Sequence, residues 1–358
     1  MKMRIQHYIL ILLTLLVLVI RFVPGAGEFY AIILYPNIST VLSWISSFVP
    51  FSLDEVVALL GIALLILTLI IGIRNAWKWQ KITLRIFVIL LWYVVWFYLG
   101  WGCNYFRNDF YTRMQIVPAR ADKEVFLRFA NDYLQRLHHF STVVYGPIDS
   151  VQTERPAFEI DQEQVVTEIK QLYQQVSPEA GLCMPKVYQQ PKEMLLNRLY
   201  SASGVLGFMG PWMGENLLNT DLLPVQFPAT YAHEYAHLLG ISNEAEANYW
   251  SYYICTKSKD PKIQYSVYSS LLVYVLTNAR VILTEDEYRE FYNSIRPEII
   301  QERLDISAHW QALHIDLIDK AQNLLLDLQL KGNNIPSGTS NYNQVIAMII
   351  SAQESAKK

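Results

Sequence analysis

Residues 231–250 read YAHEYAHLLGISNEAEANYW and decide how we expect the larger part of the chain to fold. Pro228 precedes the stretch at a point where a helix can begin, and Gly240 stands where a left-handed residue can end one. The stretch therefore predicts a short helix, a sharp turn at Gly240 and a second helix. His233 and His237 share one face of the first helix because they are four residues apart.

The two histidines and the glutamate between them form an HExxH pattern, which is typical of zinc hydrolases. Imidazoles four residues apart converge on a point off the helix face, as tetrahedral Zn²⁺ requires. Glu234 is rotated by about 100° from His233, so it can reach a water molecule at the metal without binding the metal itself. The pattern predicts His233 and His237 as metal ligands and Glu234 as the catalytic base. The alternative is a pair of packing or surface histidines beside a solvated glutamate.

A third protein ligand is needed, and the nearby candidates are Glu244 and Glu246. They are about 200° apart around a helix, so both cannot face one metal. Glu244 shares a face with Asn248, whose side-chain carbonyl can accept the second N–H of a metal-binding histidine. We therefore expect Glu244 to complete the site and Asn248 to support it. Glu246 is left as a solvated residue or as a structural contact with the chain near Arg198 or Lys186.

The N-terminal part of the chain is apolar enough to lie in a membrane. Hydrophobic residues make up 52% of the sequence and charged residues 17%, with the apolar excess concentrated in the first hundred positions. Residues 56–73 and 86–104 are long apolar segments that predict transmembrane helices. Residues 5–23 predict a third, for which the apolar region of a signal peptide is the alternative.

Basic residues in the short loops indicate the orientation. Two of them, Lys2 and Arg4, precede the first span, and four more lie between the second and third spans: Arg74, Lys78, Lys81 and Arg85. Since such loops stay in the cytoplasm, three crossings from a cytoplasmic N-terminus leave the rest of the chain outside. We therefore expect residues 1–106 to form a transmembrane region in the lipid bilayer of the cell membrane. Residues 107–358 are the expected extracytoplasmic domain.

Helical periodicity dominates residues 107–358. It is found at 121–140, 161–176, 228–239, 243–257, 262–282, 285–294, 306–331 and 340–353, and residues 331–341 have the composition of a linker. Short alternations between Lys186 and Gly210 favour a few strands. The expected fold is mainly α: three N-terminal transmembrane helices followed by a predominantly helical, zincin-like domain with a few short strands.

Composition argues against several classes of function. The net charge of −3 and the lack of a basic stripe disfavour nucleic acid as a partner. Cys103, Cys183 and Cys255 have no CxxC spacing, which excludes a zinc ribbon or a thioredoxin-type site built from neighbouring cysteines. A disulfide between Cys183 and Cys255 is left open.

The motif region resembles the gluzincin arrangement, in which HExxH and a downstream E-x-x-A-[DN] helix supply two histidines and a glutamate to zinc. The matching segments here are HEYAH at 233–237 and EAEAN at 244–248. With WGCNYFR at 101–107, NYNQVIAMI at 341–349 and the multi-span N-terminus, they make the chain similar to a bacterial family catalogued as domain of unknown function 3810. Membership implies a membrane-anchored zinc metallopeptidase, a hydrolase whose substrate the resemblance does not identify.

The expected reaction is hydrolysis of a peptide bond by metal-activated water, with Glu234 as the general base. Residues 204–216, GVLGFMGPWMGEN, are a candidate edge strand for holding an extended peptide or protein substrate. The oxyanion donor is left open among tyrosines such as Tyr231, Tyr249 and Tyr252. The main alternative is a non-catalytic membrane protein with a structural or vestigial zinc site that binds a partner, although a structural site needs no general base. Polar residues around the motif disfavour an intramembrane protease.

Overall fold

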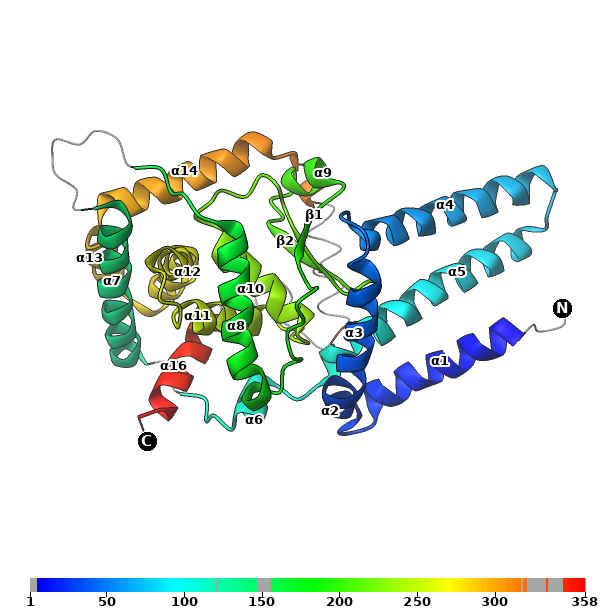
Figure 1. Ribbon diagram of the computed structural model, residues 1–358, viewed down its shortest axis with the longest axis horizontal. Helices are drawn as coiled ribbons and strands as arrows, with labels where there is room; N and C mark the ends of the chain where they lie inside the picture. Colours follow the sequence, from blue (N-terminus) through cyan, green and yellow to red (C-terminus); the bar gives the residue numbers. More distant parts are fainter. Residues whose placement is uncertain are drawn as a thin grey trace.

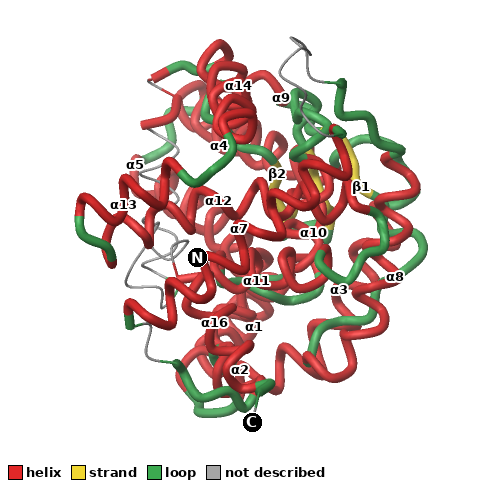
Figure 2. The backbone as a smooth tube through the Cα atoms, turned by 90° about the vertical axis from the view of Figure 1, so that its left-hand side faces the viewer, coloured by secondary structure: helices red, strands yellow, loops and turns green. Residues whose placement is uncertain are grey.

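The computed structural model describes residues 5–119, 122–146, 156–316, 318–320, 333 and 344–357. Helices dominate this part of the chain, and its strands form one small sheet, drawn in yellow among the red helices of Figure 2. The prediction of a mainly helical fold with a few short strands is therefore confirmed.

Three apolar helices project together from one side of the molecule (Figure 1). They are α1 (Ile5–Phe22), α4 (Leu53–Arg74) and α5 (Trp79–Gly100). Between α1 and α4 the chain forms one further continuous helical segment, made of α2 (Ala26–Phe29), the π-helix η1 (Tyr30–Leu34) and α3 (Tyr35–Ser46). In Figure 1, α3 runs across the bases of the projecting helices instead of alongside them.

Four helical segments of the described chain, and not the predicted three, are long and apolar enough to cross a membrane. The segment that the prediction missed is Ala26–Ser46. It is amphipathic, and polar positions interrupt the continuous apolar run by which a span is recognised. One face carries the buried serines Ser39, Ser43 and Ser46, and the other carries exposed apolar side chains: Phe29, Ile32, Ile33, Val41, Trp44 and Ile45.

The remaining helices, except α9 (Asn197–Ser201), contribute to one hydrophobic core. They are η2 (Gly102–Phe106), α6 (Phe110–Met114), α7 (Lys123–Tyr145), α8 (Gln162–Ala180), α9 (Asn197–Ser201), α10 (Phe227–Leu238), α11 (Glu244–Cys255), α12 (Pro261–Ile282), α13 (Glu285–Asn293), α14 (Pro297–Leu313) and α16 (Val345–Ser355). Helix α14 begins at Pro297, earlier than the expected 306, because proline suits the first turn of a helix. Most of the expected range 306–331 beyond Leu313, and nearly all of the linker 331–341, lie outside the described residues.

The sheet contains β1 (Pro191–Glu193), β2 (Gly207–Gly210) and β3 (Glu215–Leu218) in the order β1-β3-β2. The central strand β3 pairs with β1 in parallel and with β2 in antiparallel orientation. Strands β1 and β2 lie in the range predicted for strands, and β3 follows directly. Within the described chain β2 is an edge strand, which agrees with the expectation for residues 204–216.

Reciprocal hydrogen bonds join the first turn of α4 to this sheet. The Glu215 carboxylate of β3 accepts from the backbone N–H groups of Leu53 at 3.2 Å and Asp54 at 2.9 Å. These N–H groups have no partner within the helix. In return, the Asp54 carboxylate accepts from the backbone N–H of Trp212, in the β2–β3 loop, at 2.7 Å. Lys192 of β1 pairs with Glu215 at 2.6 Å. We call this set of contacts the α4–sheet joint.

Candidate metal centre

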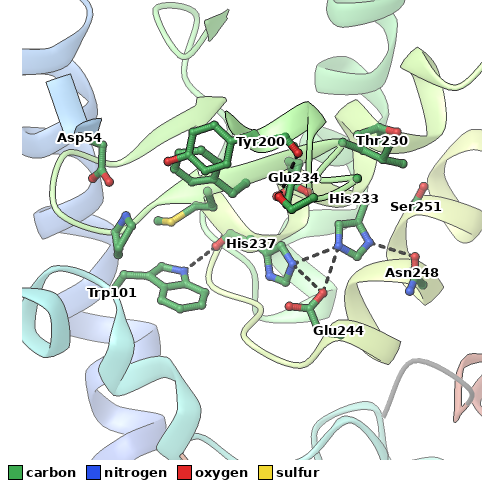
Figure 3. A pocket seen from close by; sticks show the side chains of 18 of the residues that line it. Asp54, Trp101, Tyr200, Thr230, His233, Glu234, His237, Glu244, Asn248 and Ser251 are labelled. Carbon is green, nitrogen blue, oxygen red and sulfur yellow. Dashed lines mark hydrogen bonds and ion pairs between the residues drawn. The ribbon is translucent and has the colours of Figure 1, made fainter. Parts of the chain in front are cut away.

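Three side chains from two consecutive helices converge on one point (Figure 3). His233 and His237 lie on α10, and Glu244 is the first residue of α11. The Nε2 atoms of the histidines are 3.1 Å apart, and Glu244 Oε2 lies 3.2 Å from the first and 3.4 Å from the second. A tetrahedral Zn²⁺ with bonds of about 2.05 Å requires ligand atoms about 3.3 Å from one another. The three residues therefore fit a zinc ion.

The turn between α10 and α11 makes this convergence possible. Gly240 has a φ of 102°, a left-handed conformation that favours glycine. Its N–H donates to the carbonyl of His237 at 3.0 Å, which ends the helix. Asn243 then begins α11 by accepting from the backbone N–H of Glu246 at 3.0 Å. The chain reverses sharply at Gly240, as its sequence position predicts, and returns Glu244 to the histidines.

The second ring nitrogen of each histidine has an acceptor. Nδ1 of His233 lies 3.0 Å from Asn248 Oδ1, and Nδ1 of His237 lies 2.7 Å from the carbonyl oxygen of Ile241. The amide of Asn248 is oriented by Tyr274, whose hydroxyl accepts from Asn248 Nδ2 at 3.5 Å. When the imidazoles are neutral, this network assigns the proton to Nδ1 and leaves the Nε2 lone pairs facing Glu244. Ligand histidines in metal sites are held in the same way.

Electrostatics couple the same three side chains. Burial by itself lowers the pKa of His237, but the Glu244 carboxylate outweighs burial and raises this pKa to about 9. Burial opposes ionisation of Glu244, yet His237 and His233 hold the pKa of Glu244 below its ordinary value. The centre therefore favours a positive charge next to the Glu244 carboxylate.

Glu234 lies beside the three converging atoms. Its carboxylate and the two imidazoles each offer an atom within 4.8 Å of the others, but Glu244 approaches the histidines more closely and is the better third ligand. In Figure 3, Glu234 and Glu244 lie on different sides of the imidazole pair. Burial raises the pKa of Glu234. A Cβ at Gly207 of β2 would lie 2.7 Å from Glu234 Cγ, so only glycine lets the edge strand pass this close.

Glu246 belongs to a separate buried contact. It forms an ion pair with Arg113 of α6 and accepts from Trp250 Nε1 at 2.9 Å. The Arg113 and Glu246 side chains are each only 5% exposed. The prediction that Glu246 makes a structural contact agrees with this arrangement. The predicted location of that contact, near Arg198 or Lys186, is wrong.

Residues from the N-terminal region hold the end of α10. Tyr35, Trp101 and Arg107 donate to main-chain carbonyls within residues 237–240 at 2.8, 2.8 and 3.1 Å, respectively. Carbonyls at a helix end lack partners within the helix, so the bonds from Tyr35 and Arg107 satisfy two such groups, whereas Trp101 adds a second donor to the His237 carbonyl, which also accepts from the Gly240 N–H. Trp101 is 6% exposed and lies in the core, although aromatic residues at the end of a span are more often interfacial anchors. We call Tyr35, Trp101 and Arg107 the carbonyl clamp.

A cavity of about 1080 Å³ opens at the centre. Its wall includes the five residues predicted for the site, namely His233, Glu234, His237, Glu244 and Asn248. Tyr200 and Tyr274 are also part of the wall, and neither stood out in the sequence. The three tyrosines proposed from the sequence, Tyr231, Tyr249 and Tyr252, do not belong to the part of the wall formed by described residues.

The three cysteines are free and buried, so the disulfide left open between Cys183 and Cys255 is not formed. Burial raises the pKa of Cys183 to about 12. The thiol is therefore protonated at neutral pH and is a poor nucleophile.

Together, the fold and the centre define a mainly helical protein with helices apolar enough to cross a membrane and a His–His–Glu cluster in a large cavity. A family model described as protein of unknown function (DUF3810) matches residues 30–350. The chain belongs to this family, as the resemblance of its motifs suggested. No curated protein and no solved structure matches the chain.

Proposed function

We propose that this protein is a membrane-anchored zinc-dependent peptidase with a zincin-like centre. His233, His237 and Glu244 would hold the ion, and Asn248 would keep His233 in its binding orientation. The observation that carries the proposal is the triangle of ligand atoms, whose sides of 3.1, 3.2 and 3.4 Å suit tetrahedral zinc. The acceptors on both Nδ1 atoms support the same assignment.

A bound zinc ion supplies Lewis acidity, which lowers the pKa of water and polarises a carbonyl group. Glu234 borders the triangle from another side, so its carboxylate can accept the proton of the attacking water and pass it to the leaving amine. The Tyr274 hydroxyl accepts from Asn248 and can donate its own proton toward the carbonyl oxygen of the substrate. Each of these residues then has one task in the reaction.

The edge strand favours a peptide as the substrate. Residues 207–209 of β2 line the cavity, and Gly207 lies directly beside Glu234. An extended peptide can pair with an edge strand through its main chain, which gives affinity without requiring one side-chain sequence. A peptide bond held in this way lies next to the proposed base.

The open cavity favours catalysis over the alternative of a structural zinc site. Structural zinc sites are closed by a fourth protein ligand, whereas catalytic sites have three protein ligands and an open position. Here the three candidate ligands all belong to the wall of the 1080 Å³ cavity, and Glu234 borders them as a base would.

We further propose that α1, α4 and α5 cross the membrane and that Ala26–Ser46 lies along its surface. Both ends of this segment are tied to the domain. Glu28 pairs with Arg107 at 3.1 Å, and Lys192 donates to the carbonyl of Ser46 at 2.5 Å. A helix whose two ends are both held on the same side of the membrane does not cross the membrane. Three crossings with basic cytoplasmic loops then place the N-terminus inside and the domain outside.

The direct test uses the full-length protein in detergent, because the carbonyl clamp shows that residues before 107 contribute to the centre. Zinc content is measured by mass spectrometry of the metal, and hydrolysis by a peptide-library screen. We expect one zinc ion per chain and cleavage that the Glu234→Gln variant loses. A chain that purifies folded without zinc after zinc supplementation, or cleavage that survives in Glu234→Gln, would contradict the proposal.

A further inference from the structure

The cavity around the candidate centre extends along two of the projecting helices. Its wall includes Ala58 of α4 and, on α5, Leu90, Val94 and Phe97. Leu90 lies ten residues before the end of α5 at Gly100, a distance of about 15 Å at 1.5 Å per residue. That is about half of the hydrocarbon thickness of a bilayer, which is about 30 Å. The wall therefore runs from the His–His–Glu triangle to the middle of a proposed span.

Beyond the first turn of α4, the part of the wall formed by the projecting helices is mostly apolar. The side chains of Leu90 and Val94 are 46% and 48% exposed, although both belong to the cavity wall. The carboxylates at the start of α4 bind the protein's own main chain. Asp54 accepts from Trp212, and Glu55 accepts from the backbone N–H groups of residues 195 and 196 at 2.7 and 2.8 Å. An apolar segment that enters the cavity here moves from hydrocarbon to an apolar wall, at little cost in free energy. A polar peptide would have to give up its hydration, which costs free energy.

Given the proposed peptidase function, we infer that the substrate enters the centre from the bilayer and is the juxtamembrane segment of a membrane-anchored polypeptide. One end of β2 lies against α4, because a Cβ at Gly210 would lie 2.7 Å from the Asp54 side chain. The other end, at Gly207, lies against Glu234. The apolar wall of α4 and α5, the edge strand β2 and the His–His–Glu triangle therefore follow one another along the cavity. A polypeptide that leaves the bilayer in extended form contacts all three in this order. A lipid has no main chain to pair with β2, so the strand favours the polypeptide.

Site-specific photocrosslinking in vesicles tests this entry route without requiring hydrolysis. The full-length Glu234→Gln protein carries benzoylphenylalanine at Leu90 in vesicles of phosphatidylethanolamine and phosphatidylglycerol. The probe is a biotinylated peptide with one apolar span of about 20 residues and a polar tail. Leu84 is the matched control position, because it also lies on α5, is 45% exposed and is not part of the described cavity wall. We expect several-fold more crosslinking at Leu90 than at Leu84, and no competition by the isolated tail.

Three results would overturn the inference. The first is equal crosslinking at Leu90 and Leu84, which would indicate only random contact in the bilayer. The second is full competition by the isolated tail, which would indicate entry from water. The third is labelling of Leu90 by a photoactivatable phospholipid with none by the peptide, which would make this wall a lipid site.

Matched substitutions separate this inference from the proposed activity. In the active protein, Leu90→Trp fills the apolar wall and should lower cleavage of the anchored probe at least tenfold, whereas Leu84→Trp should leave it unchanged. Both variants should contain as much zinc as the parent protein. Unchanged cleavage in Leu90→Trp would contradict entry from the bilayer. Loss of zinc or of all hydrolysis in the parent protein would instead contradict the proposed peptidase.

Discussion

Replacing Glu244 and Glu246 separately should have different effects: the first should weaken zinc binding, and the second should lower the stability of the fold. Glu244→Ala removes one of three protein ligands. Complete zinc sites bind with about 10–16 kcal/mol, so loss of one ligand should cost about 3 kcal/mol or more, which is over 100-fold in Kd. Asn248→Ala leaves the ligands in place but removes the acceptor of His233 Nδ1, and should weaken zinc by about 10 to 100-fold.

Glu246→Ala should have the opposite effect. The substitution leaves Arg113 buried without its carboxylate and Trp250 without its acceptor. Breaking a buried ion pair from one side costs about 3–5 kcal/mol. For a domain of this size, each kcal/mol lowers the Tm by about 2–4 °C. We therefore expect a Tm about 10 °C lower, with zinc still bound below that temperature.

The assay combines zinc content after dialysis against a weak chelator with thermal unfolding of each full-length variant. Glu246→Gln is the control, because the amide can still accept from Trp250 and should recover part of the stability. A Glu246→Ala protein that loses zinc while Glu244→Ala retains it would refute the assignment of the third ligand. It would also leave Asn248 with no role at the centre.

Three further predictions concern the base, the carbonyl clamp and the topology. Glu234→Gln should retain zinc and lose at least about 100-fold in the rate of peptide hydrolysis, because the amide cannot accept a proton; unchanged turnover on a verified substrate would remove Glu234 from the mechanism. Trp101→Phe removes the side-chain donor to the His237 carbonyl, which keeps its bond from the Gly240 N–H, and should cost about 0.5–1.5 kcal/mol of stability, measured by thermal unfolding. The exposed Trp96 offers the control Trp96→Phe, and equal effects of the two substitutions would argue against the clamp. A C-terminal reporter that is active only in the cytoplasm should be silent, and a strong cytoplasmic signal would reverse the proposed orientation.

Local spacing predicted the parts of the candidate centre that lie close together in the chain. The α10 and α11 helices and the turn at Gly240 follow from helical periodicity and glycine chemistry within residues 227–255. The same spacing predicts that Asn248 accepts from a ligand histidine, and the structure identifies this histidine as His233. Whether these residues bind zinc stays a prediction.

Contacts between distant segments left no signal in the sequence. Tyr35 binds a carbonyl 203 positions away, and Trp101 binds one 136 positions away. Neither contact produces a periodicity, and an aromatic residue near a span is more often an interfacial anchor. The segment Ala26–Ser46 was missed because its serine face packs on the domain, which makes it less apolar than a helix surrounded by lipid.

The α4–sheet joint has a consequence for where such a peptidase would cut. Because Glu215 accepts from the main chain of α4 and Asp54 accepts from the β2–β3 loop, the sheet beside the candidate centre cannot swing relative to the start of α4 without breaking buried hydrogen bonds. If α4 crosses the membrane as proposed, the centre would be held at one fixed height above the bilayer. A peptidase built in this way would select the bond at a set distance from the bilayer and would tolerate wide variation in the residues on either side of that bond.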